Sequence, residues 1–80
     1  MYYVYLLRST IYPEKTYIGF TYDVSQRLER HNAGHVPATT DFKPWTLVAY
    51  VVLDSKEKAM SFEKYLKVGS GHAFAQRRLW

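Results

Sequence analysis

The segment that most restricts the fold is an unbroken apolar run near the start of the chain, from Tyr2 to Leu7. Polar residues do not alternate with apolar ones in this run, so neither face of the segment suits contact with water. Its shortness and its content of valine and tyrosine favour a strand over a helix. We therefore predict a strand over 2–8 that other parts of the chain cover on both faces.

The rest of the chain alternates between segments of strand and helix character. Pro13 and its charged neighbours indicate a loop that joins the first two strands as an antiparallel pair. Asp23 and Asp54 are each followed three residues later by Gln or Glu, which is typical of a helix start. Gly34 and the segment Gly69-Ser70-Gly71 indicate helix ends. The predicted elements are strands over 2–8, 16–20 and 45–53, helices over about 23–32, 55–67 and 72–80, and a long polar loop over 34–44.

This order of elements predicts a single α+β domain over residues 1–80, with a three-stranded antiparallel sheet flanked by helices. Eighty residues leave no room for a second domain, and the absence of cysteine excludes disulfides and thiolate metal sites. No apolar run reaches the roughly 18 residues that a membrane span needs, and no signal peptide is recognisable. We expect a cytoplasmic protein that does not bind membranes; the sequence identifies no protein partner and no oligomeric state.

Arg27 and His31 stand four residues apart on the first predicted helix, so both project from one side of it. We place that side away from the apolar stripe formed by Val24 and Leu28. An arginine can hold a phosphate through two charge-assisted hydrogen bonds, and a histidine beside it can relay a proton near neutral pH. The alternative is an ordinary solvated helix face.

Glu63 lies at the border of the apolar stripe of the second predicted helix, where a carboxylate would be partly buried. One carboxylate, together with water and a substrate phosphate, is enough for a Mg²⁺ site. The alternative is a surface ion pair with Lys67, four residues further on. Tyr5 and Tyr17 lie on neighbouring strands and are either site tyrosines or core aromatics, while Gly19, at the predicted end of its strand, permits a close approach of the backbone.

Together these residues resemble one family, the GIY-YIG endonucleases. Tyr3-Val4-Tyr5 and, about a dozen residues later, Tyr17-Ile18-Gly19 are similar to the paired motif that names the family. The second motif is intact, whereas the first keeps only Tyr5. The segments around Arg27 and His31, around Trp45 and around Glu63 are similar to the family's first helix, third strand and glutamate helix. The resemblance covers nearly the whole chain and is strongest to small stand-alone bacterial members.

The resemblance implies hydrolysis of a phosphodiester with one divalent ion. Glu63 would hold Mg²⁺ or Mn²⁺, Arg27 would stabilise charge on the phosphoryl oxygens, and Tyr5 or Tyr17, with His31, would activate water. The expected nucleic-acid contacts are Arg27, Arg30, Lys43 and Lys67. Two positions depart from the family pattern: Gln76 lies in the region where many members have asparagine, and Phe20 follows the glycine of the second motif.

Three functions are therefore compatible with the sequence. The first is a metal-dependent nuclease acting on DNA or RNA, with DNA favoured, by recognition of strand structure and not of base sequence. A formal charge of +4 suits such a polyanionic partner. The second is a nucleic-acid-binding module without catalysis on the same fold. The third is a protein-interaction domain that uses its 14 aromatic residues as anchors.

Overall fold

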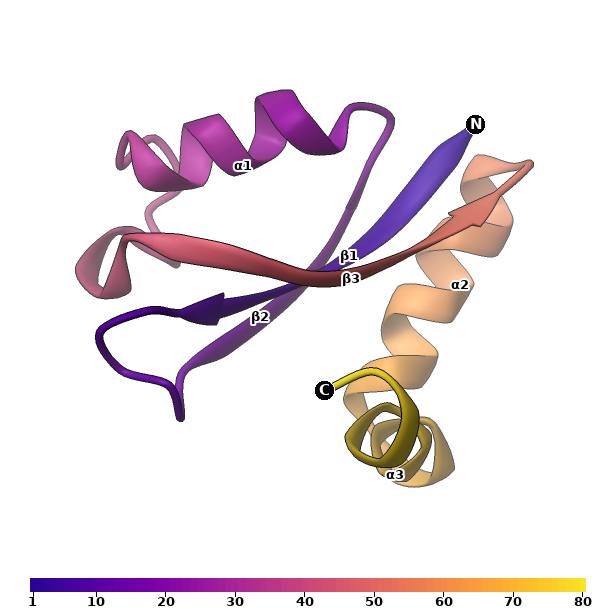
Figure 1. The fold of residues 1–80 in the computed structure, drawn as a ribbon. Coiled ribbons are helices and arrows are strands. Elements are labelled where there is room, and N and C mark those ends of the chain that lie inside the picture. Colours follow the sequence, from indigo (N-terminus) through magenta and orange to yellow (C-terminus); the bar gives the residue numbers. More distant parts are fainter.

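The fold is a three-stranded antiparallel sheet with helices on both faces, seen in a computed structural model that describes residues 1–80 (Figure 1). The strand order is β2-β1-β3, as predicted for an α+β domain. The elements are β1 (Tyr2–Ser9), β2 (Thr16–Thr21), α1 (Val24–Asn32), a short 3₁₀ helix η1 (Thr40–Phe42), β3 (Trp45–Leu53), α2 (Lys56–Lys67) and α3 (Gly69–Arg78).

The apolar strand β1 is the central strand of the sheet and pairs with both of its neighbours. Its side chains alternate between two buried faces: Val4 and Leu6 belong to one core cluster, and Tyr5 and Leu7 to another. All four are almost completely inaccessible to solvent. The prediction of a strand covered on both faces is confirmed, because residues 4–7 are buried in core clusters on both sides of the sheet, while Tyr2 and Tyr3 are half-buried.

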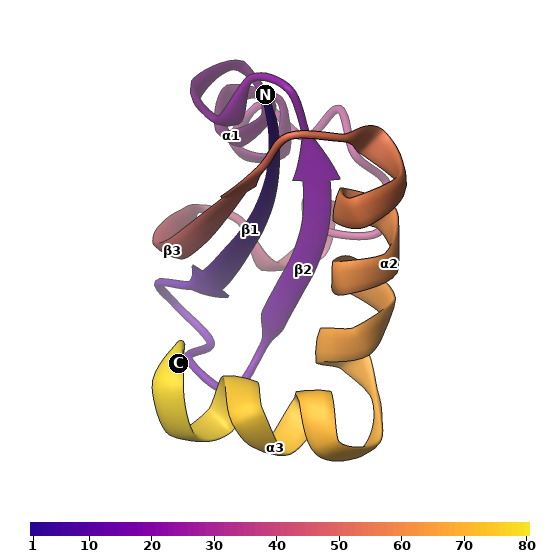
Figure 2. The same cartoon turned by 90° about the vertical axis from the view of Figure 1, so that its right-hand side faces the viewer.

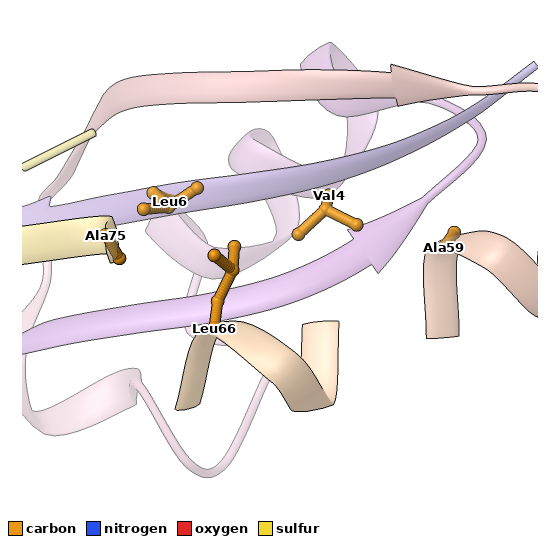
Figure 3. Packing of buried hydrophobic residues seen from close by; sticks show 5 residues of the cluster. All are labelled: Val4, Leu6, Ala59, Leu66 and Ala75. Carbon is orange, nitrogen blue, oxygen red and sulfur yellow. The ribbon is translucent and has the colours of Figure 1, made fainter. Parts of the chain in front are cut away.

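The two faces of the sheet are covered by different helices. Leu66 and Ala59 of α2 and Ala75 of α3 pack against Val4 and Leu6 on one face (Figure 3). On the other face α1 contributes Val24 and Leu28, which pack with Tyr5, Leu7 and Trp45. Figure 2 shows that α2 runs beside β2, which is one of the two edge strands of the sheet.

The predicted starts of α1 and α2 are correct to within one residue. The Asp23 carboxylate caps α1 by accepting from the backbone N–H of Gln26 at 3.0 Å. At the second helix the cap is Ser55, whose hydroxyl accepts from the backbone N–H of Lys58 at 3.1 Å. Asp54, the predicted cap, instead forms an ion pair with Lys58. Serine and aspartate are equally good caps, so their order along the chain does not decide between them.

The terminal helix begins earlier than predicted, at Gly69 and not at His72. Gly69 has a positive φ of 57°, which turns the chain between α2 and α3. A Cβ on Gly71 would lie 1.8 Å from the backbone oxygen of Tyr65, so only glycine lets α3 start against the end of α2. The glycines that looked like a break therefore form the first turn of a new helix.

The segment predicted as a long polar loop is more ordered than expected. It contains the helix η1, and its end is fastened to α1 by the side chain of Asn32. The Asn32 amide oxygen accepts from the backbone N–H of Trp45 at 2.5 Å, and its nitrogen donates to the Trp45 carbonyl at 3.1 Å. No helix of the chain has the length and apolar character needed to span a membrane.

Candidate active site

The candidate site is built around Tyr5 and Gly19, which face each other across β1 and β2. A Cβ added to Gly19 would lie 2.6 Å from the Tyr5 hydroxyl oxygen and 3.0 Å from a ring carbon of Tyr17. The Tyr5 ring therefore lies across the backbone of the edge strand, in the space that a side chain would fill. Gly19 lies inside β2 and not at its end as predicted, and its role is to admit this ring.

The Tyr5 hydroxyl is joined to α1 by a chain of buried hydrogen bonds. It lies 2.9 Å from Nε2 of His31, and Nδ1 of the same ring lies 2.8 Å from the hydroxyl of Thr39. The Thr39 hydroxyl in turn donates to the carbonyl of Val36 at 3.3 Å. His31 is fully buried and continues the Val24–Leu28 stripe, so the prediction that it lies away from that stripe is wrong. The heptad spacing from Val24 to His31 brings both to the same side of the helix.

We assign the proton of His31 to Nδ1 from these contacts. Because the Thr39 hydroxyl gives its proton to Val36, it accepts from Nδ1–H of His31. Nε2 is then the acceptor, and the Tyr5 hydroxyl donates to it. Burial, followed by the charges of Arg27 and Arg30, lowers the pKa of His31 and so favours the neutral ring that this arrangement requires.

The other predicted residues surround the Tyr5 hydroxyl. Burial, and then the neighbouring Tyr17, raises the pKa of Tyr5, while the guanidinium of Arg27 acts in the opposite direction and Glu63 adds a smaller rise. The ring of Tyr17 lies edge-on to His31, with 5.0 Å between centroids, and is 6.2 Å from the ring of Tyr5. The rings of Tyr5, Tyr17 and His31, from β1, β2 and α1, thus meet at one place, and Arg27 and Glu63 act on it through their charges.

Glu63 approaches this place from α2, beside the edge strand. Its side chain is only 19% exposed, which agrees with the predicted position at the border of the apolar stripe. It pairs with Lys67 at 2.5 Å, which is the surface ion pair predicted as the alternative to a metal site. No group of three or more His, Cys, Asp or Glu side chains gathers anywhere in the chain.

Two hollows flank the convergence point along the edge strand. One has a volume of about 430 Å³ and is lined by Tyr2, Phe20, Thr21, Tyr22, Arg27 and Lys56. The other has a volume of about 280 Å³ and is lined by Thr16, Tyr17, Ile18, Leu66, Lys67, His72, Gln76 and Trp80. Phe20 and Gln76, the two positions that depart from the family pattern, therefore line the walls of these hollows. Each hollow also carries basic side chains suited to a phosphate strand.

Two of the predicted nucleic-acid contacts lie apart from these hollows. Arg30 lines a separate shallow depression on the exposed side of α1 and reaches the site only through its charge on His31. The Lys43 ammonium lies near Gly34, at the C-terminal end of α1. Arg27 and Lys67 line the hollows themselves. Thr39, which fixes the proton of His31, was not predicted, because its distance from His31 in the loop is set by the fold and not by helical spacing.

Comparison with known proteins identifies the family of this chain. The model of the GIY-YIG catalytic domain matches residues 1–74, and the chain belongs to that family. Among its relatives are UPF0213 proteins of Streptococcus pyogenes serotypes M5 (strain Manfredo) and M1. Each is 43% identical over 67 residues, which cover 81% of this chain and 70% of the relative.

A solved structure shares the fold. The solution NMR structure of the UPF0213 protein BH0048 from Bacillus halodurans is 34% identical to this chain, with a TM-score of 0.54. The match covers 96% of this chain and 82% of that protein. The resemblance stated from the sequence motifs is therefore confirmed at the level of family and fold.

Proposed function

We propose that this protein is a divalent-metal-dependent nuclease that hydrolyses phosphodiester bonds of nucleic acid. The observation that carries the proposal is the buried Tyr5–His31–Thr39 chain, whose phenol is also influenced by the charges of Arg27 and Glu63. The chain supplies the phenol with an acceptor for its proton, which a tyrosine acting as a general base needs. Membership of the GIY-YIG family supports the same reaction class.

Tyr5 is the tyrosine that we propose as the base. Its pKa is raised by burial, so the phenolate is not the resting form near neutral pH. With the proton of His31 assigned to Nδ1, however, the Tyr5 hydroxyl donates to Nε2 of His31. As the attacking water gives a proton to the Tyr5 oxygen, the phenol proton passes to His31, and no free phenolate is formed. Tyr17 has no such acceptor, and we propose that it forms the wall of the site.

The cationic side chains of Arg27 and Lys67 would contact the phosphates of the substrate. Arg27 would bind the scissile phosphate and stabilise the negative charge that develops on its oxygens. Lys67 would be drawn from Glu63 toward the phosphate strand as the carboxylate takes up a metal ion. Both residues line the hollows beside the edge strand, where a strand of nucleic acid can pass.

The residues present fit a single Mg²⁺ or Mn²⁺ ion. Glu63 is a part-buried carboxylate, and Mg²⁺ needs only one or two carboxylates because it keeps several waters. Glu63 would hold the ion. When bound, such an ion supplies Lewis-acid polarisation of the phosphoryl group.

We propose DNA as the substrate, recognised by its strand structure. A domain whose principal extents are 28 × 25 × 17 Å offers little surface for reading base edges in a groove. Contacts to phosphates position a protein on nucleic acid without sequence preference, and basic side chains beside the edge strand are suited to that role.

The test is cleavage of end-labelled DNA and RNA, as single strands, duplexes and flaps, with Mg²⁺, with Mn²⁺ and with EDTA. Glu63→Gln preserves the shape of the side chain and should lower the rate by about 100-fold or more, since a metal ion contributes several kcal/mol. Glu57→Gln, on the exposed first turn of α2, is the matched control and should leave the rate unchanged. Calorimetric titration with Mn²⁺ should detect binding to the parent and not to Glu63→Gln. Equal cleavage in EDTA, or by Glu63→Gln, would exclude the mechanism.

The ion pair between Glu63 and Lys67 favours a second candidate function, a nucleic-acid-binding module without catalysis. A lysine that occupies the carboxylate supplies the positive charge that a metal ion would otherwise bring. This function predicts salt-sensitive binding and no turnover, because phosphate contacts release counterions. Lys67→Ala separates the two: a nuclease keeps its metal binding, whereas the binding module binds neither metal nor, at moderate salt, nucleic acid.

A further inference from the structure

Three tyrosines border a hollow on the α1 face of the sheet that the proposed reaction does not use. Tyr3 and Tyr50 lie edge to face, with ring centroids 5.6 Å apart, and Tyr22 stands beside them just before α1. Tyr22 is 75% exposed and Tyr50 is 52% exposed. The hollow has a volume of about 300 Å³, and its other lining residues are Asp23, Val24, Ser25 and Leu47.

This tyrosine hollow is continuous with the site through one side chain. Tyr22 lines both the tyrosine hollow and the hollow that contains Arg27 and Lys56. A ligand held by the two cations therefore has the Tyr22 ring as its next neighbour on the way to Tyr50.

The two hollows differ in charge. The hollow at Arg27 and Lys56 carries two cations and no acidic side chain, which suits a phosphate. The tyrosine hollow has no cation, and its only charged residue is Asp23. Its carboxylate would repel a phosphate, but it can accept a hydrogen bond from the exocyclic amino group of a base. A nucleotide whose base lies in the tyrosine hollow and whose phosphate lies in the hollow at Arg27 and Lys56 would match the charge of both.

We propose that the tyrosine hollow is a stacking site for an unpaired base, one that adjoins the phosphate held at Arg27 and Lys56. Exposed aromatic rings next to a cationic track are how proteins hold single-stranded nucleic acid, because every base has a face that can stack. A base inside a duplex is already stacked on both sides and cannot enter. The substrate class is therefore a single strand, or a single-stranded extension, and not a blunt duplex; this inference rests on the proposed nuclease function.

The test is binding measured by fluorescence anisotropy in EDTA, so that no cleavage occurs, with a labelled single strand and a blunt hairpin duplex as probes. Tyr22→Ala combined with Tyr50→Ala should weaken binding of the single strand about tenfold or more. Binding of the duplex should change less than twofold. Tyr22→Phe with Tyr50→Phe keeps the rings and should bind like the parent. Tyr12→Ala removes a tyrosine of similar exposure from the β1–β2 loop and serves as a control.

Several outcomes overturn the proposal. If the alanine pair binds the single strand as the parent does, or loses the two probes equally, then the tyrosines do not stack an unpaired base. Loss of affinity in the phenylalanine pair would assign the effect to the hydroxyls instead. Because binding is measured without metal, a protein that does not cleave can still show the tyrosine effect. The inference and the proposed nuclease function can therefore fail separately.

Discussion

Replacement of Gly19 by alanine tests the central geometric claim about the site. Gly19 lies inside β2 opposite Tyr5, and no unusual backbone angle requires glycine there. What excludes a side chain is the Tyr5 ring: an added Cβ would lie 2.6 Å from its oxygen and 2.8 Å from the carbon that bears it. The ring cannot simply swing away, because it is 1% exposed and bonded to His31.

One stabilising and two destabilising effects set the change in the free energy of unfolding. Alanine in place of glycine inside a strand should stabilise the fold by about 0.5–1 kcal/mol through the lower entropy of the unfolded chain. Overpacking a buried site costs about 1–3 kcal/mol. Displacement of the phenol also loses the hydrogen bond to His31, which contributes about 0.5–1.5 kcal/mol. Overpacking and the lost hydrogen bond outweigh the entropy, so we expect Gly19→Ala to be less stable than the parent by about 1–3 kcal/mol.

The assays are urea unfolding and DNA cleavage. Cleavage should fall by about 100-fold even where the variant is fully folded, because a shift of the Tyr5 oxygen by about 1 Å spoils the alignment of the base. Gly19→Ala combined with Tyr5→Phe removes the atom in closest contact and should recover part of the lost stability, though not the activity. A Gly19→Ala variant as stable as the parent would refute the reasoning, since strand propensity alone would then decide the outcome.

Three further predictions concern the buried chain and the helix junction. Thr39→Val leaves Nδ1–H of His31 without an acceptor and should cost about 1–3 kcal/mol in urea unfolding. Because the fold lowers the pKa of His31, the unfolded chain takes up a proton on this ring at a higher pH than the folded protein does. The free energy of unfolding should therefore fall as the pH drops below about 6.5, and His31→Gln should make it less dependent on pH. Gly71→Ala forces its Cβ onto the Tyr65 carbonyl and should unfold α3, seen as lost helical circular dichroism.

The sequence determined the elements of this fold and most of its core. Strand β3 was predicted with its observed bounds, and β1, β2, α1 and α2 to within one residue at each end, because hydrophobic period and capping residues are local signals. The burial of β1 on both faces followed from its composition alone, whereas its central position in the sheet is seen only in the structure. The part-buried position of Glu63 also followed from helical spacing, as did its pairing with Lys67.

Only the tertiary structure decided how the site is assembled. The register of β1 on β2, which the sequence leaves open, sets Tyr5 over Gly19 and so turns an ordinary glycine into the floor of the site. Thr39 meets His31 because the 34–44 segment folds back over α1, and that path depends on contacts distant in sequence. Local sequence patterns indicate which residues form strands and helices. The hydrogen bond between Tyr5 and His31 depends instead on distances that only the packing of these elements sets.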